Sequence, residues 1–164
     1  MILGMSIPAF TLLHVIITLI AIGSGLIAVG GMFASHKLPG TTALFLFTTI
    51  LTSVTGFLFP IHGFTPALGV GIVSCVILAV ALLAYYGKHL TGAWRWIYVV
   101  TAIASLYLNV FVLVAQSFVK VAVLNVLAPT QSEPPFVIAQ VSVMLIFIVI
   151  GIFAAIKFRP IVRA

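Results

Sequence analysis

Acidic residues are almost absent from this sequence. Glu133 is the single acid among 164 residues, and charged residues of both signs make up only 5% of the chain. Glycoside hydrolysis by paired carboxylates and metal sites built from carboxylates both need at least two acids, so the sequence excludes them. It also lacks a P-loop, an HExxH motif and a dinucleotide-binding fingerprint. Hydrolytic and phosphoryl-transfer enzymes are therefore disfavoured, and these absences favour a non-enzymatic role without deciding it.

Cysteine is nearly absent as well. Cys75 is the only one and lies in the middle of an apolar segment, which leaves no disulfide, no CxxC redox pair and no cysteine metal cluster. Histidine adds little, because His36 and His89 are expected at a membrane surface in contact with water. A b-type haem would need His14 and His62 as its two axial ligands, and they are expected at different depths, so haem b fits poorly. No metal site is predicted.

Apolar residues are what the chain has in abundance. They make up 64% of it, and the mean hydropathy is +1.43. Such a chain cannot cover itself with a polar surface, so we expect an integral membrane protein whose main partner is the lipid bilayer. The formal net charge of +6 would indicate nucleic-acid binding in a soluble protein. Here the basic residues stand at the ends of apolar runs, as the positive-inside rule describes, and no nucleic-acid partner is predicted.

The apolar runs predict the architecture. Each is close to or longer than the ~20 residues that a helix needs to cross a bilayer. Residues 121–127 are too short to cross, and the proline-rich stretch 128–135 interrupts the helices. The fold class is therefore all-α, a single domain over residues 1–164 that forms one bundle of five transmembrane helices. The predicted helices are 7–33, 41–59, 66–86, 94–120 and 136–157.

The basic residues also predict an orientation. Two connections and the C-terminal tail carry most of them on one side, while the other side has Lys120 and Glu133. The positive-inside rule then places the N-terminus outside and the C-terminus in the cytoplasm. We expect a multi-pass protein of the cell membrane, most simply the bacterial inner membrane. The bases on the cytoplasmic side are Lys37, Lys88, Arg95, Lys157, Arg159 and Arg163.

The helix 94–120 carries a polar stripe that organises the functional prediction. Its polar residues recur at steps of three and four, which places them on one helix face. Polar side chains are costly in hydrocarbon, so this face should point into the bundle. In the helix 7–33, His14 shares a face with Thr11 and Thr18, and four glycines should let neighbouring helices approach. The stripe consists of Tyr98, Thr101, Ser105, Asn109, Gln116 and Lys120, and the glycines are Gly23, Gly25, Gly30 and Gly31.

Depth along the helices, taken at about 1.5 Å per residue, brings the strongest polar groups into one layer of the outer half. The inner half of the same faces offers mainly hydroxyls and glycines, so the layer predicts a pocket open to the outside and not a continuous pore. The predicted outer rim is His62 and Glu133, and pairing of Glu133 with Lys120 would hold the connection 121–135 over the pocket as a lid. The predicted ligand-binding residues are His14, Thr55, Asn109, Gln116, Lys120 and Gln140.

Several functions fit this pocket. A His, amides and a Lys within an apolar wall suit a lipophilic molecule with a polar head, such as a quinone, in a redox-associated or accessory subunit. The first alternative is a small-solute or ion transporter or channel that uses the same stripe. The second is a purely structural subunit in which the polar residues hydrogen-bond one another between helices. The sequence leaves open whether other membrane subunits or further copies of the chain are partners.

Overall fold

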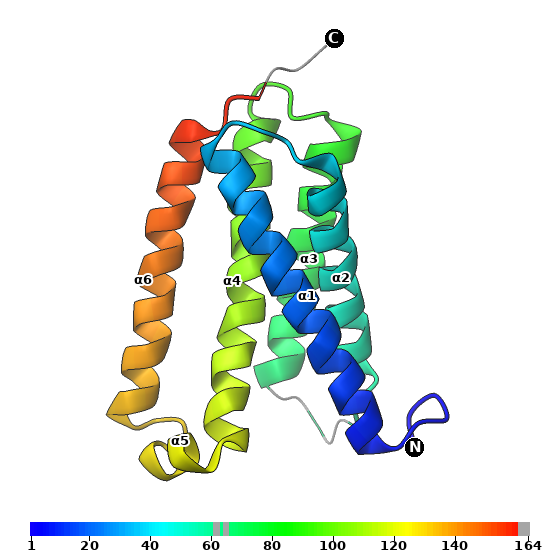
Figure 1. Cartoon of the computed structure of the whole chain (residues 1–164), viewed down its shortest axis with the longest axis vertical. Coiled ribbons are helices and arrows are strands. Elements are labelled where there is room, and N and C mark those ends of the chain that lie inside the picture. The colour runs from blue at the N-terminus through cyan, green and yellow to red at the C-terminus, as the bar shows by residue number, and fades with distance from the viewer. Residues whose placement is uncertain (61–62, 64–65, 161–164) are drawn as a thin grey trace.

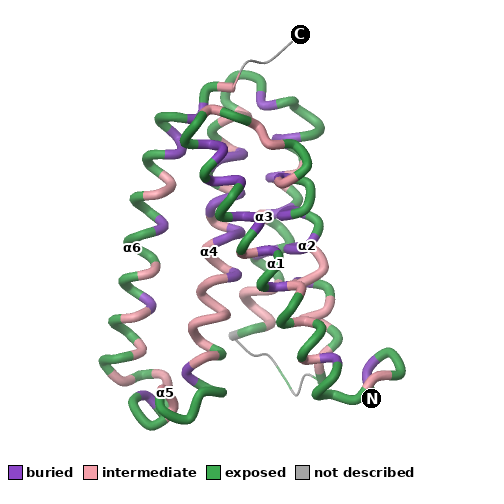
Figure 2. Tube along the Cα trace, viewed as in Figure 1, coloured by how far each residue is buried: buried purple, intermediate pink, exposed green. Residues whose placement is uncertain are grey.

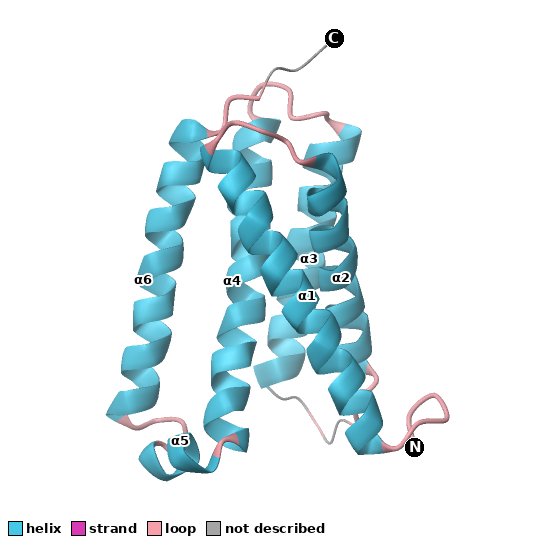
Figure 3. Cartoon of the chain, in the orientation of Figure 1, coloured by secondary structure: helices cyan, strands magenta, loops and turns pink. Residues whose placement is uncertain are grey.

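Seven helical segments follow one another in the computed structural model of the chain, which describes residues 1–60, 63 and 66–160. The five long segments are apolar enough to cross a membrane, and the described residues form no strand (Figure 3). The predicted all-α fold with five membrane-length helices is therefore confirmed. The segments are α1 Ile7–Phe33, α2 Pro39–Phe57, α3 Pro66–Leu82 with its π-helical continuation η1 Leu83–Gly87, α4 Trp94–Lys120, the short α5 Ala122–Leu127 and α6 Pro134–Lys157.

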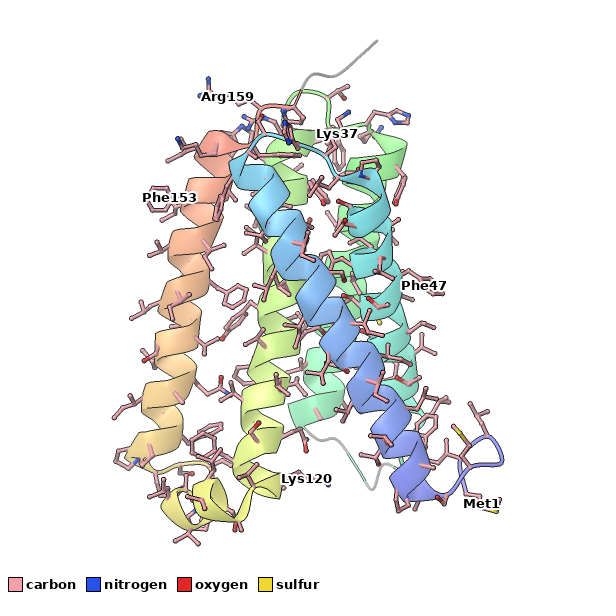
Figure 4. The ribbon with its side chains drawn as sticks, viewed as in Figure 1. Met1, Lys37, Phe47, Lys120, Phe153 and Arg159 are labelled. Atoms are coloured by element: carbon pink, nitrogen blue, oxygen red, sulfur yellow. The ribbon has the colours of Figure 1, made fainter. Side chains whose placement is uncertain are left out.

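α4 lies in the middle of the arrangement (Figure 1). It packs against α3 on one side and α6 on the other, while α1 crosses it and packs along α2. α6 contacts α4 and α1. We call the lower end in Figure 1, where α1 begins and α4 stops, the Lys120 end, and the opposite end the Lys37 end; Figure 4 labels both lysines.

Two helices begin earlier than the sequence predicted, because prolines open them. α2 begins at Pro39 and α6 at Pro134, where residues 41 and 136 were predicted. A proline at the first position of a helix loses no hydrogen bond, because that N–H has no partner within the helix, and its fixed φ suits the first turn. The prediction left both prolines in the connections that precede these helices. α2 also stops at Phe57, two residues before its predicted end.

The tightest packing lies toward the Lys37 end. Figure 2 shows the buried residues concentrated in that half, whereas the other half is mostly intermediate or exposed. Small residues bring the helices together there: Gly25 of α1 faces Phe45 and Leu106, which are 2% and 1% exposed. Of the four glycines expected to let neighbouring helices approach, Gly25 does so, while Gly31 lies against Leu38 and the His36 carbonyl oxygen of the connection that follows α1. Gly23 and Gly30 have no neighbour that an added Cβ would meet within 4 Å.

Polar contacts tie the chain together at the Lys37 end. The Arg95 guanidinium at the start of α4 donates to the carbonyl oxygens of Ala155 and Phe158, so it satisfies carbonyls that the end of α6 leaves free. The backbone N–H of Arg159 donates to the Ser35 hydroxyl across 2.7 Å. These contacts hold the C-terminal end of α6 to the first connection and to α4.

The outer surface of the helices is apolar. Phe47 of α2 and Phe153 of α6 point away from the bundle in Figure 4 and are 59% and 54% exposed. Many aliphatic side chains of the five long helices are equally exposed, which is consistent with contact with a lipid bilayer.

The glycine packing makes a testable prediction. A Cβ at Gly25 would stand 2.7 Å from Leu106 Cδ1 and 2.9 Å from Phe45 Cδ2. We expect Gly25→Val to lower the free energy of unfolding by about 1–3 kcal/mol, because the helices must separate to admit the side chain. Gly23→Val is the matched control in the same helix and should change stability by less than about 0.5 kcal/mol. Thermal unfolding in detergent measures both, and equal losses would contradict close packing at Gly25.

Candidate functional site

A cavity of about 510 Å³ opens inside the bundle toward the Lys120 end. α1, α2, α3 and α4 all contribute to its wall, which includes apolar side chains such as Phe57, Leu68 and Val112. α1 stays beside α2 toward this end, where His14 meets Thr55, but it diverges from α4, which leaves this space (Figure 1). The polar side chains that line it are Thr11, His14, Thr18, Thr52, Ser53, Ser74, Asn109, Gln116 and Lys120.

The polar stripe of α4 divides into two parts. Asn109, Gln116 and Lys120 line the cavity, with Asn109 deep and 5% exposed and the other two exposed nearer the end of the helix. The remaining members lie toward the Lys37 end, where Tyr98 and Ser105 are buried in the packed core. The stripe thus points into the bundle along its whole length, but only its second half meets a cavity.

His14 is held on the cavity wall by α2. Its Nδ1 lies 2.7 Å from the Thr55 hydroxyl oxygen, and its ring meets the Phe59 ring edge to face at 5.4 Å between centroids. Thr55 does not line the cavity itself; it contacts His14 from behind. Gly56 leaves room for the imidazole, since a Cβ there would stand 3.7 Å from its Cε1.

The hydroxyl hydrogens near the cavity are largely used by the helices themselves. The Thr55 hydroxyl donates to the carbonyl of Leu51 across 2.7 Å, and the Thr18 hydroxyl donates to that of His14 across 2.8 Å. Such bonds to the carbonyl four residues earlier are common for Ser and Thr in helices. Since the hydrogen of Thr55 is already used, its oxygen accepts from His14, which places the imidazole proton on Nδ1 and leaves Nε2 as an acceptor.

Asn109 connects α4 to α2. Its Nδ2 donates to the Thr49 hydroxyl oxygen across 3.2 Å, and the Thr49 hydroxyl in turn donates to the Phe45 carbonyl across 2.8 Å. Next to them, Ser53 of α2 and Ser74 of α3 are hydrogen-bonded across 3.3 Å. In the described part of the chain the Asn109 carbonyl oxygen has no hydrogen-bond partner. The deep end of the cavity is therefore polar and partly satisfied by contacts between helices.

Gln140 is placed away from the other predicted ligand-binding residues. It lies on α6, which contacts α4 and α1 but contributes nothing to the cavity wall. Its Nε2 donates to the carbonyl of Phe111 across 3.1 Å, and its buried Oε1 has no partner among the described residues. Depth along a single helix carries no information on which helices face one another, so it could not place Gln140.

The structure also differs from the prediction at the rim residue Glu133 and at the connection 121–135, which was predicted to be a lid. Glu133 accepts hydrogen bonds from Thr130 and Ser132 within its own turn, and no ion pair joins it to Lys120 in the described residues. Slight desolvation raises its pKa and these hydrogen bonds lower it, with a net pKa below its ordinary value. Gln131 donates to the Ala115 carbonyl across 2.7 Å, which holds the connection against α4. None of its residues lines the cavity, so it is not a lid.

The histidines other than His14 play no part in this cavity as far as the structure describes it. His36 and His89 are exposed near the Lys37 end, as expected, and His62 lies outside the described residues. Among the described residues no three His, Cys, Asp or Glu side chains are close enough to hold a metal ion.

Sequence reasoning missed the hydroxyls of the deep cavity wall as site residues. Ser53, Ser74, Thr18 and Thr52 line it, and Thr18 and Thr52 lie 3.4 Å apart across the interface of α1 and α2. The signal was present, because each lies on a small or polar helix face. Such faces also occur wherever helices simply pack together, so only the relative placement of the helices shows that they border a cavity.

Comparison of the chain with protein-family models, with curated proteins and with solved structures finds no match. No relative therefore assigns a ligand or a reaction to the cavity. Its function has to be argued from the residues that line it.

The contact between His14 and Thr55 predicts a coupling between α1 and α2. His14→Ala and Thr55→Val should each destabilise the protein, and a double-mutant cycle should give a coupling of about 0.5–1.5 kcal/mol in the free energy of unfolding. Thr11→Val serves as the control, since the Thr11 hydroxyl donates to the Ile7 carbonyl of its own helix. His14→Ala and Thr11→Val should show additive effects. Additivity of His14→Ala with Thr55→Val would contradict the contact.

Proposed function

We propose that the chain is a multi-pass membrane protein that binds an amphiphilic molecule, such as a quinone, in the cavity at the Lys120 end. The observation that supports this most directly is the mixed wall, in which polar side chains from all four helices stand among apolar ones such as Phe57, Leu68 and Val112. Its volume of about 510 Å³ falls within the range of small-molecule sites, roughly 300–1,000 Å³. A role as a redox-associated or accessory subunit would follow from a ligand of this class.

A neighbouring groove supports a ligand with an apolar tail. It has a volume of about 480 Å³ and runs along the start of α1, where Pro8 and Leu12 face outward. Ile7, Thr11, Val15 and Lys120 line both the groove and the cavity, so the two adjoin. A ligand with its polar head in the cavity could thus place its tail in this groove, between α1 and α4 and toward the lipid.

The alternative of a transporter or channel receives less support. Between the cavity and the Lys37 end the bundle is filled by buried side chains, among them Val99, Ala102 and Leu106, each no more than 2% exposed. Conduction needs a hydrated or polar path across the whole bilayer. A binding site that is closed on one side agrees better with this packing, and solute flux into liposomes that contain the pure protein would favour transport.

The charges support the orientation proposed from the sequence. The described bases other than Lys120 gather at the Lys37 end, and the positive-inside rule makes this end cytoplasmic. The cavity would then open on the outer side of the membrane, which in a bacterium is the periplasmic side of the inner membrane. The bases at the Lys37 end are Lys37, Lys88, Arg95, Lys157 and Arg159.

Cysteine labelling tests this orientation. In a Cys75→Ser background, Ser132→Cys and Thr91→Cys place one exposed thiol at each end of the bundle. A membrane-impermeant maleimide added to intact spheroplasts should label Ser132→Cys and should label Thr91→Cys only after permeabilisation. The opposite pattern would overturn the orientation, and with it the outer placement of the cavity.

The two glutamines of the spanning helices test the location of the site. Gln116 lines the cavity, whereas Gln140 lies outside it on α6. If a short-chain quinone or quinol binds in the cavity, Gln116→Leu should weaken its binding by roughly 5- to 100-fold, because a hydrogen bond to the head is lost. Gln140→Leu should leave binding unchanged. Calorimetric titration in detergent measures both, and equal effects would place the ligand elsewhere.

A further inference from the structure

Several groups that line the cavity are left only as hydrogen-bond acceptors, although Asn109 keeps a second amide hydrogen and the Thr52 and Ser74 hydroxyls donate to no carbonyl among the described residues. His14 gives its Nδ1 proton to Thr55, which leaves the Nε2 lone pair, and no described residue donates to that nitrogen. The Thr11 and Thr18 hydroxyls donate to carbonyls of α1, so their oxygens too can only accept from a ligand. The Asn109 carbonyl oxygen is likewise without a partner in the described part of the chain.

This excess of acceptors on the cavity wall follows from the hydrogen bonds within the helices and not from the residue types alone. Ser and Thr carry a donor as well as an acceptor, but at Thr11, Thr18 and Thr55 the helix uses the hydroxyl hydrogen on its own carbonyls. An acceptor on the wall that the helices leave unused can be satisfied by a donor that a ligand brings.

The mouth of the cavity has the opposite character. Gln116 and Lys120 are exposed there, and they supply an amide N–H pair and an ammonium group. The lining contains no acid, so no fixed negative charge favours a cationic ligand. Phe57 and Phe59 line the wall, and Phe59 already meets the His14 ring edge to face. Flat aromatic walls of this kind suit an aromatic head.

We propose that the cavity selects an aromatic head that donates a hydroxyl hydrogen to His14 Nε2, so that it binds an alkylated hydroquinone or phenol in preference to the corresponding quinone. This inference rests on the proposed function and specifies its ligand. A quinone carbonyl only accepts hydrogen bonds, so it would meet the lone pair of Nε2 without a donor between them. The hydroquinone places its O–H there, and its second oxygen remains for the donors at the mouth.

Three probes with the same ring and the same decyl tail test the proposal on the unaltered protein. They are a decyl hydroquinone, the decyl quinone and the dimethyl ether of the hydroquinone, titrated calorimetrically under argon with partition into empty micelles subtracted. We expect the hydroquinone to bind about tenfold or more tightly than either of the others, since only it supplies the donor. Equal or tighter binding of the quinone overturns the inference while the proposed function stands. If none of the three binds, the proposed function fails and the inference fails with it.

Two substitutions of His14 then identify the acceptor. His14→Asn keeps a donor at the position of Nδ1 for Thr55 but removes the acceptor at the position of Nε2, so the preference for the hydroquinone should disappear. His14→Gln can keep an acceptor oxygen near the position of Nε2 and should retain part of that preference. A preference that survives in His14→Asn at full size would show that another group accepts the ligand's proton and would overturn the assignment to His14.

Discussion

The close packing of α1 against α2 and α4 around Gly25 is the constraint on which the rest of the structure depends. In a lipid environment, helices gain little from burying apolar surface, so small residues that let backbones approach decide which faces meet. Gly25 against Phe45 and Leu106 fixes the three helices in the half toward the Lys37 end. Arg95 adds α6 to this arrangement through the carbonyls at its end. Because α1 crosses α4, the two diverge beyond this point while α1 stays beside α2, and the cavity lies where α1 and α4 have separated.

The chemistry of the cavity follows from the absence of water around the helices. Each hydroxyl in a spanning helix needs an acceptor, and the carbonyl four residues earlier is commonly within reach, although the buried Ser105 hydroxyl has no partner among the described residues. Thr55 shows the consequence for the site: its bond to Leu51 turns its oxygen into the acceptor for His14, which fixes the imidazole tautomer. A residue that does not line the cavity thereby determines what His14 offers to a ligand.

The same physics explains why the site could be predicted only in part. His14, Asn109, Gln116 and Lys120 were expected in one polar region and line one cavity, because the cost of polar groups in hydrocarbon directs them into the bundle. Gln140 was expected with them, yet it faces α4 from the other side and bonds to Phe111. Glu133 likewise bonds within its own turn and not to Lys120. The helix ends at Pro39 and Pro134 differed because a proline can open a helix as well as stop one.

The sequence by itself determined the number of long helices, their approximate bounds and the face of α4 that turns inward, since these depend on hydropathy and on the period of a single helix. Only the tertiary structure decided which helices meet. It placed Thr55 behind His14, put Ser53 beside Ser74, and left α6 outside the cavity. The physical reason is that a polar side chain in a membrane needs a hydrogen-bond partner, but its place in the sequence does not say which neighbour supplies that partner. That choice depends on how closely small residues such as Gly25 let particular helices approach.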